Sequence, residues 1–569
     1  MSRRSTPYTV TNMQNKPETT GTAFCGSLAL IGGKIYLGQG RFAQALLIQN
    51  GVVVQAGSTE AILSATDPHE PVVNLQGRTA LPGFHDSHLH LLGIAKRLRS
   101  IHLQGCRSRK ELVDRCRAYA DAHPEESFLV ARGWDQELFS DDTTLPDRQL
   151  LDSVTTTRPL IASRICGHIL ACNTRALELA GITAHTQVEG GSILLGPDGL
   201  PNGVLCERAG RLLWDLAPEP SRESLEQALL CAMEQAVSEG LTTVQTNDLR
   251  EENLETLLPL YQALFHRGLP PLRVVHQIRF TTPEALQAFL ARNGPGALND
   301  TAHRFGSIKL MADGSLGSRT ALLRHDYADA PGIRGVAWMT QQTMDEMFRL
   351  CQQAGVPAII HAIGDGAITM ALDSMEAACG DGGNPFRHGI VHCQITDSTL
   401  LRRIQASGAQ VFLQPVFINS DWPMLPVRVG TALAKTSYAF GTLLRRGVPV
   451  SYGTDAPVES FRPLDNLHCA VNRTDLKDCP PEGWHPEERV TVQQAIDAYT
   501  AGGAFASGEA HVKGLLFPGY YGDVTVLDRD IFTVNPMDIR HLQVDLTITG
   551  GRLVFQRKAE ESVCAFTAN

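Results

Sequence analysis

Leu81-Pro82-Gly83-Phe84-His85-Asp86-Ser87-His88-Leu89-His90 is the segment from which the fold can be inferred. It ends an apolar run, and residues two apart in an extended strand point to the same face. His88 and His90 would then present their imidazoles together, as two ligands of one metal ion do. Asp86 shares this face and is placed to orient a ligand from behind. A polar strand face fits the same pattern, so the metal interpretation depends on the rest of the chain.

The chain has 569 residues, too many for one compact domain, so two or three domains are expected. Its formal charge of −10, from 50 basic and 60 acidic residues, argues against a nucleic acid or an anionic membrane as partner. No apolar run reaches the roughly 18 residues that span a bilayer. A small-molecule substrate is the expected partner, and assembly as a homodimer is left open.

The N-terminal residues 1–23 are polar, and we expect them to form a disordered tail. A transit peptide is the weaker alternative, and no apolar segment of a secretory signal follows Arg3-Arg4. The thirteen cysteines include no C-x-x-C pair. This pattern indicates reduced thiols and a cytoplasmic protein.

Both ends of the chain consist of short apolar segments separated by turn residues, which predicts β-strands. Asn50-Gly51 separates two short apolar segments and predicts a hairpin. Residues 24–82 and 512–569 are therefore expected to form one composite β-sandwich domain. The strands expected in it are 28–31, 34–37, 45–49, 52–55, 523–528, 545–549 and 552–555.

The middle of the chain alternates apolar strands with amphipathic helices, which predicts βα units and a parallel sheet. Residues 83–99 and 221–511 are expected to form an α/β fold of the (β/α)8 TIM-barrel type. Its helices include 221–239, with Gly240 at the C-cap, and 491–507, which begins with a capping box. The strands expected in it are 84–90, 241–246, 272–278, 307–311, 356–361, 389–393 and 448–453.

Residues 100–220 interrupt this alternation after the first barrel strand. The segment is far longer than a connection between a strand and a helix should be. We therefore expect an inserted subdomain over the barrel mouth.

Residues with metal-ligand chemistry recur at the ends of separate predicted strands, where barrel enzymes place their active sites. After the first strand come Lys309, His361, His392 and Asp455, in that order. A buried lysine must be paired, neutral or modified. Each residue also has an ordinary explanation, such as a core histidine, a lysine reaching solvent or an aspartate capping a turn. The ordered recurrence favours a metal site, whereas Asp365 is expected to be the N-cap of the next helix.

Six sequence motifs resemble those of a known family. They are residues 81–90, Arg132-Gly-Trp-Asp-Gln136, Lys309-Leu-Met-Ala-Asp-Gly-Ser-Leu-Gly-Ser-Arg-Thr320, His361-Ala-Ile-Gly-Asp365, His392-Cys-Gln394 and Gly453-Thr-Asp-Ala-Pro-Val458. Together they resemble the amidohydrolase superfamily of metal-dependent hydrolases, in the branch that contains N-substituted formamide deformylase. The resemblance covers nearly the whole chain. Relatives often have Gly-Ser-Asp where this chain has Gly-Thr-Asp, and that departure alters no ligand.

The resemblance implies a (β/α)8 barrel and a role for each ligand-type residue. His88 and His90 would bind the buried metal ion, and His361 and His392 the more exposed one. Carboxylated Lys309 would bridge the two ions, most naturally zinc, while a site with one ion stays open. The sixth implied ligand, which would also shuttle the proton, is Asp455.

Residues that contact the substrate are harder to identify. Trp134 has the alternative role of a packing anchor, and Arg319 that of a structural partner of Asp313. The candidates for substrate binding are Trp134, Asp135, His168, Glu207, Ser315, Arg319 and Arg473.

The predicted function is hydrolysis of a C–N bond in a small amide-type substrate resembling an N-substituted formamide. A hydroxide held by the metal would attack the carbonyl, and Asp455 would move the proton. A deaminase or a cyclic-amide hydrolase with the same site is one alternative. A metal-binding regulatory protein without catalysis is the second.

Overall fold

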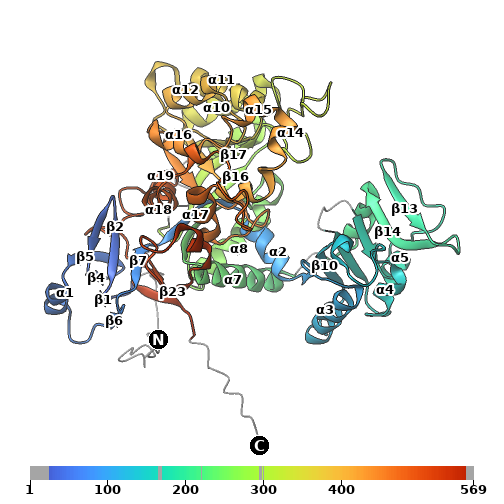
Figure 1. The fold of residues 1–569 in the computed structure, drawn as a ribbon, viewed down its shortest axis with the longest axis horizontal. Helices are drawn as coiled ribbons and strands as arrows, with labels where there is room; N and C mark the ends of the chain where they lie inside the picture. The colour runs from blue at the N-terminus through green and yellow to red at the C-terminus, as the bar shows by residue number, and fades with distance from the viewer. Residues whose placement is uncertain (1–24, 165–168, 219–220, 294–297, 299, 559–569) are drawn as a thin grey trace, which may run out of the picture. The chain divides into compact units, whose positions relative to one another are not determined.

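The computed structural model describes residues 25–164, 169–218, 221–293, 298 and 300–558. The chain divides into two compact units. One comprises the residues up to Ile94 together with those from Leu229 onward, and the other is Ala95–Ala228. Figure 1 labels the helices and strands of both units. Among the described residues, no helix is both long and apolar enough to cross a membrane.

An eight-stranded parallel sheet forms the centre of the first unit (Figure 1). Backbone hydrogen bonds of 2.8 Å from Asp455 N to His88 O and from His90 N to Ala456 O join its first and last strands. The sheet is therefore a nearly closed barrel, and the predicted barrel is confirmed. Its strands are β8 (Phe84–Leu89), β15 (Leu241–Thr246), β16 (Arg273–Arg279), β17 (His303–Met311), β18 (Ala358–Ala362), β19 (Gly389–His392), β20 (Gln410–Leu413) and β21 (Val450–Tyr452).

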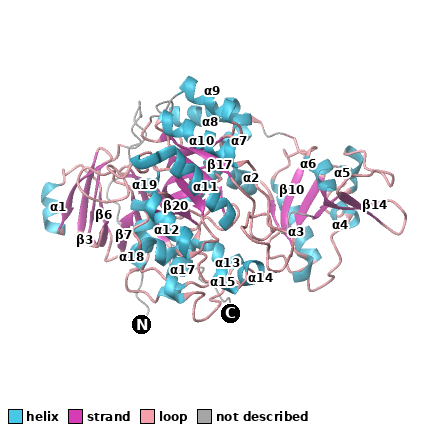
Figure 2. Cartoon of the chain, turned by 90° about the horizontal axis from the view of Figure 1, so that it is seen from above, coloured by secondary structure: helices cyan, strands magenta, loops and turns pink. Residues whose placement is uncertain are grey.

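Helices cover the outside of the barrel (Figure 2). In α10 the buried residues Met344, Met347, Phe348 and Cys351 recur at helical spacing, so one face of the helix packs inward. Gly355, at a φ of 68°, ends this helix in the left-handed conformation that glycine adopts without strain. The main helices are α7 (Arg222–Ser238), α8 (Leu254–His266), α9 (Pro283–Asn293), α10 (Gln341–Ala354), α11 (Asp365–Cys379), α12 (Ser398–Ser407), α16 (Phe440–Arg445), α17 (Pro463–Asn472), α18 (Val492–Tyr499) and α19 (Ala501–Ala506).

Two further sheets of the first unit come from the ends of the chain. One apolar core joins them, with Leu30 and Ile48 from the first sheet and Val524 and Ile548 from the second. The hairpin predicted at Asn50-Gly51 is confirmed, because both residues have positive φ angles, 50° and 81°, and join antiparallel strands. The division into a β-sandwich domain and an insertion stays a prediction. The first sheet contains β5 (Val52–Gly57), β4 (Ala45–Gln49), β1 (Leu28–Ile31) and β6 (Val72–Asn74), and the second β24 (Arg552–Gln556), β23 (Val544–Thr549), β22 (Val524–Leu527), β7 (Thr79–Pro82), β2 (Lys34–Gly38) and β3 (Arg41–Ala43).

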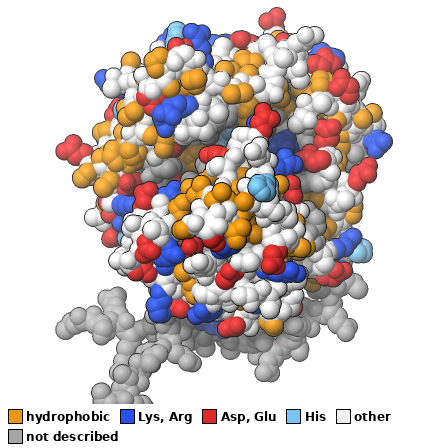
Figure 3. Space-filling view, turned by 90° about the vertical axis from the view of Figure 1, so that its right-hand side faces the viewer, with side chains coloured by type: hydrophobic (Ala, Val, Ile, Leu, Met, Phe, Trp, Pro, Cys, Tyr) orange, Lys and Arg blue, Asp and Glu red, His pale blue; other side chains and the backbone are white. Residues whose placement is uncertain are grey.

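The second unit has a six-stranded sheet of its own. Its central strands pair partly in parallel and partly antiparallel, unlike those of the barrel. On the face drawn in Figure 3, coloured acidic and basic side chains are interspersed with apolar ones. The strands are β13 (Gly191–Leu195), β14 (Pro201–Glu207), β12 (Ile169–Cys172), β11 (Leu160–Arg164), β10 (Leu129–Trp134) and β9 (Ile101–His102), and the longest helix is α3 (Arg109–Ala122).

Three local expectations need correction. The predicted helix 491–507 is two helices, because Thr500 leaves the helical conformation with φ −127° and ψ −82°. The capping box of Thr491 and Gln494 at its start is present. Strand β20 was not expected. Asp365 is not the N-cap of α11, because its carboxylate accepts hydrogen bonds from Arg324 instead.

A buried ion pair joins the barrel to the second terminal sheet. Arg273, at the start of β16, donates two 3.1 Å hydrogen bonds to Asp523, which precedes β22. We expect Asp523→Ala to lower the free energy of unfolding by about 3–5 kcal/mol, because it leaves a buried guanidinium without its carboxylate. Urea unfolding measures the change.

The exposed pair of Glu346 and Arg349 on α10 provides the control for this prediction. Glu346→Ala is expected to change the unfolding free energy far less than Asp523→Ala does, since solvent screens that pair. Equal losses in the two variants would contradict the prediction.

Candidate metal centre

The residues with ligand chemistry all stand at the carboxyl ends of parallel barrel strands. Parallel strands bring these ends to one rim, so side chains far apart in the sequence meet there. The positions are His88 and His90 at the end of β8, Lys309 near the end of β17, His361 on β18, His392 at the end of β19 and Asp455 just beyond β21.

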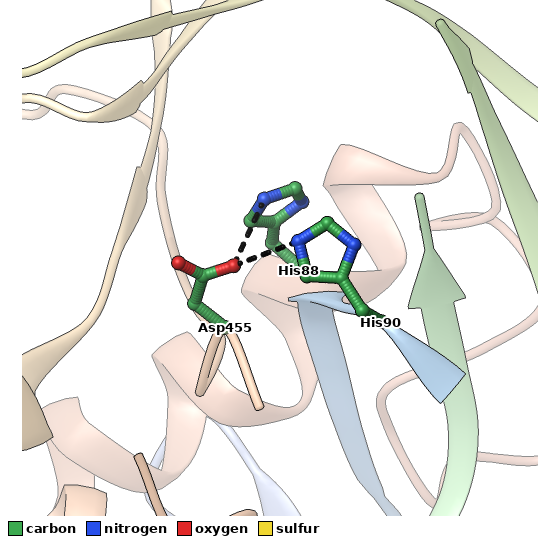
Figure 4. Close-up of side chains that lie close together, drawn as sticks. All are labelled: His88, His90 and Asp455. Atoms are coloured by element: carbon green, nitrogen blue, oxygen red, sulfur yellow. Dashed lines mark ion pairs between the residues drawn. The ribbon is translucent and has the colours of Figure 1, made fainter. Parts of the chain in front are cut away.

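His88, His90 and Asp455 form the tightest group (Figure 4). Asp455 Oδ1 lies 3.5 Å from His88 Nε2 and 3.2 Å from His90 Nε2. One donor atom from each residue falls within 4.8 Å of the others. Two imidazole nitrogens and a carboxylate oxygen converging on one point suit a divalent ion such as zinc.

A second pair of histidines adjoins this group. The ring centroids of His361 and His392 are 4.5 Å apart, and those of His392 and His88 are 5.7 Å apart. His361 Nε2 faces Gly314 O at 3.0 Å and Asp313 Oδ1 at 3.3 Å. Its Nδ1 is therefore the nitrogen left to face a ligand. The structure thus brings all four predicted histidines together.

Lys309 is buried at this centre, only 1% exposed, and its Nζ has no hydrogen-bond partner among the described residues. Burial lowers the pKa of Lys309 to about 7, against the opposing charge of Asp455. Burial favours the neutral acid of Asp455, but its hydrogen bond with His90 and the charges of the neighbouring histidines hold its pKa below the ordinary value. The lysine is thereby available as a neutral amine near neutral pH.

The histidines differ in the protonation state that their surroundings favour. Burial, together with the charge of Lys309, holds the pKa of His88 well below its usual value, and burial and His361 do the same for His392. Burial also opposes protonation of His90, but the hydrogen bond and charge of Asp455 raise its pKa. Neutral imidazoles and charged carboxylates are the forms that bind metal ions, so this donor set fits a metal.

Asp86 lies behind the ligands rather than among them. Its carboxylate accepts hydrogen bonds from the backbone N–H and the hydroxyl of Thr454, from Tyr499 OH and from the backbone N–H of His88. The expectation that Asp86 supports the ligands from behind agrees with these contacts. One carboxylate thus holds the backbone beside His88 and the backbone beside Asp455.

Three residues that contact the histidine rings from outside were not among the predicted site residues. Gln277 Oε1 lies 2.5 Å from His88 Nδ1, and Gln414 Oε1 lies 2.8 Å from His392 Nδ1. The backbone carbonyl of Asn247 lies 3.2 Å from His90 Nδ1. A polar residue at the end of an apolar barrel strand is the only sequence signal they share.

Two of the substrate-binding candidates in the second unit, Trp134 and Asp135, have partners within that unit. Trp134 is fully buried, and its Nε1 donates a 3.0 Å hydrogen bond to a backbone carbonyl of β11, which favours the role of a packing anchor. Asp135 forms a 2.8 Å ion pair with Arg164. Glu207 ends β14 with an exposed side chain and a φ of 53°. His168 lies outside the described residues.

The substrate-binding candidates Ser315 and Arg319 of the first unit also contact other side chains. Ser315 is exposed, and its hydroxyl lies 2.8 Å from that of Ser318. Arg319 forms a 2.8 Å ion pair with Asp329, so the suggested structural pair with Asp313 is wrong. Contact of these residues with a substrate stays a prediction.

Arg473 is fully buried near the last barrel strand. Its guanidinium donates 3.0 Å hydrogen bonds to the backbone carbonyls of Trp484 and Tyr438, and it lies over the ring of Phe440 at 4.7 Å. These contacts favour a structural role over substrate binding.

Comparison with known proteins agrees with this geometry. The model of the amidohydrolase family matches residues 71–555. The YtcJ protein of Bacillus subtilis (strain 168), named as an amidohydrolase, is 30% identical over 531 residues, covering 92% of this chain and 99% of its own. The N-substituted formamide deformylase of Arthrobacter pascens is 24% identical over 535 residues, covering 90% and 95%.

A solved structure supports the same assignment. An uncharacterized metal-dependent hydrolase from Pyrococcus furiosus superposes with a TM-score of 0.74 and 28% identity, covering 89% of this chain and all of its own. The protein is therefore a metal-dependent hydrolase. More particularly, the chain belongs to the amidohydrolase family and is an enzyme acting on carbon–nitrogen bonds other than peptide bonds.

Removal of a histidine from the tight group should release metal. We expect His88→Ala to lose bound metal and activity together, because only two of the three converging donors remain. Elemental analysis of the purified protein measures the metal content. His388→Ala is the control, since His388 is a buried histidine that contacts Gln352 instead of the centre. Full metal occupancy in His88→Ala would rule out the ligand role.

Proposed function

We propose that the centre holds two divalent ions, most naturally zinc, and that carboxylated Lys309 bridges them. The support is the convergence of four histidines and Asp455 around a buried lysine whose Nζ has no hydrogen-bond partner among the described residues. Mixed imidazole and carboxylate donors suit zinc. His88 and His90 would hold one ion, His361 and His392 the other, and Asp455 would complete the set.

Carboxylation of Lys309 is chemically balanced in this setting. The neutral Nζ adds to the carbon of carbon dioxide. A C–N bond forms, one C=O π bond opens onto its oxygen, and the nitrogen releases one proton to water, which leaves a negatively charged carbamate. The lowered pKa, about 7, supplies the neutral amine that this reaction needs. The carbamate would also remove the cost of burying the ammonium form of Lys309, because the group would then carry a negative charge instead of a positive one.

We propose hydrolysis of an amide-type C–N bond in a small organic substrate resembling an N-substituted formamide. Bound divalent ions supply an activated water molecule and a polarised carbonyl. Asp455 acts first as a general base, taking a proton from the attacking water at Oδ1, and then as a general acid that delivers it to the leaving nitrogen. The position of Oδ1, 3.2 Å and 3.5 Å from two ligand nitrogens, is the single observation that carries this role.

The formamide-like substrate class rests on similarity to the deformylase of Arthrobacter pascens. The cytoplasmic location and the homodimer stay predictions.

The proton-transfer role predicts the behaviour of one conservative variant. Asp455→Asn should reduce kcat at least about a hundredfold, since the amide cannot accept the proton. Metal content and the unfolding midpoint, measured on the same sample, show whether the loss arises from chemistry or from the site itself. Unchanged kcat in this variant would refute the role.

The proposed function as a whole is tested by counting metal and identifying products. We expect about two ions per chain, and formate plus an amine from N-substituted formamides. About one ion, with ammonia as product, would favour a deaminase, and a ring-opened acid would favour a cyclic-amide hydrolase. Protein prepared without chelators that holds no metal and turns nothing over would favour the non-catalytic alternative.

A further inference from the structure

Two buried glutamine amides face the two metal-site histidines that are most deeply buried. Gln277, on β16, presents Oε1 to His88 Nδ1 at 2.5 Å. Gln414, immediately after β20, presents Oε1 to His392 Nδ1 at 2.8 Å. The two arrangements come from different strands and serve histidines of different predicted ions. Both contacts engage Nδ1, so Nε2 of each ring is left for a metal ion.

The orientation of each amide is fixed by its own NH₂ group. Gln277 Nε2 donates to the backbone carbonyl of Ser87 at 2.9 Å, and Gln414 Nε2 donates to that of Phe412 at 3.1 Å. A carbonyl oxygen only accepts hydrogen bonds, so the NH₂ end of each amide must face it. The other end, Oε1, then faces the imidazole and likewise only accepts.

An acceptor at Nδ1 determines which ring nitrogen carries the proton. A neutral histidine beside Oε1 keeps its proton on Nδ1, and the lone pair is then on Nε2. In His88 that nitrogen is the one that faces Asp455. We infer that Gln277 and Gln414 are positioning residues that set the tautomer and the ring plane of His88 and His392 for metal binding. This inference rests on the proposed metal site and assigns residues that act on it from outside.

An amide performs this task without adding charge. A carboxylate in the same place would orient the ring too, but it would bring a further negative charge into a buried centre that already holds Asp455. The glutamines therefore act on ring orientation and tautomer. Their removal should weaken metal binding even where the fold persists.

The experiment compares three isosteric variants of buried glutamines. Gln277→Met and Gln414→Met remove the acceptor and keep the bulk. The matched control is Gln410→Met, because Gln410 is buried at the start of β20 and its amide binds the backbone carbonyl of Arg387, away from the centre. Affinity for Zn²⁺ is measured by competition with a chromophoric chelator, and the absorption of Co²⁺ bound at the site reports its ligand geometry.

We expect Gln277→Met and Gln414→Met each to weaken Zn²⁺ binding by about 10–100-fold and to change the Co²⁺ spectrum. Gln410→Met should keep the wild-type affinity and spectrum. Unfolding midpoints of the metal-free proteins measure how much stability is lost with a buried amide. Gln410→Met gives the size of that loss away from the metal centre. Affinity in the two variants equal to that of Gln410→Met would overturn the inference.

The readout separates this inference from the proposed function. Metal affinity needs no substrate, so failure to hydrolyse formamides would contradict the proposed substrate class alone. Wild-type affinity in His88→Ala would contradict the ligand assignment itself.

Discussion

Closure of the barrel is the constraint on which the site depends. The backbone N–H of Asp455 donates to His88 O, and that of His90 donates to Ala456 O, each at 2.8 Å. Asp86 strengthens the seam through Thr454, which lies 368 residues further along the chain. Each hydrogen bond contributes only about 1 kcal/mol net, but together they fix the separation of the ligands. The first histidines and the aspartate meet only when the barrel closes, so folding and site assembly are one event.

The backbone is also strained at the centre, both at the seam and at the end of β19. Asp455, His392 and Cys393 have φ angles of 56°, 77° and 48°, in the left-handed region that non-glycine residues seldom adopt. Each such residue costs about 1–3 kcal/mol and persists only where its surroundings hold it. Hydrogen bonds from Asp455 N to His88 O and from Cys393 N to Ala362 O do so here. This conformation turns the chain sharply at the ends of β19 and β21, where the side chains of His392 and Asp455 face the centre.

The sequence was sufficient to predict the barrel and to select the residues that converge. Each of these residues lies at or near the end of an apolar strand, and parallel topology brings strand ends together, so order along the chain was enough. Strand β20 was missed because it begins with the polar Gln410 and follows α12 closely. Gln414 could not be assigned without that strand.

The remaining errors have a common physical origin. Asp365 has the residue type and position of an N-cap, but tertiary contact with Arg324 takes its carboxylate. Arg319 pairs with Asp329, whereas the carboxylate of Asp313 accepts hydrogen bonds from the backbone N–H groups that follow β18. The partner of a polar loop residue depends on the tertiary fold, whereas the position of a strand-end residue follows from the regular barrel topology. The convergence of the strand-end residues was therefore predictable, and their outer partners were not.

The electrostatics of the centre show why a metal suits it better than a proton does. Burial disfavours the protonated forms of His88 and His392, and Lys309 disfavours them further. Among these histidines, Asp455 raises the pKa above its usual value only for His90, at the edge of the group. Protonation of the histidines would place several positive charges around the buried Lys309. Carboxylation of Lys309 would instead make that side chain negatively charged. A divalent ion would then bind neutral imidazoles whose rings are oriented by neutral amides. The Asp455 carboxylate and the Lys309 carbamate would balance its charge.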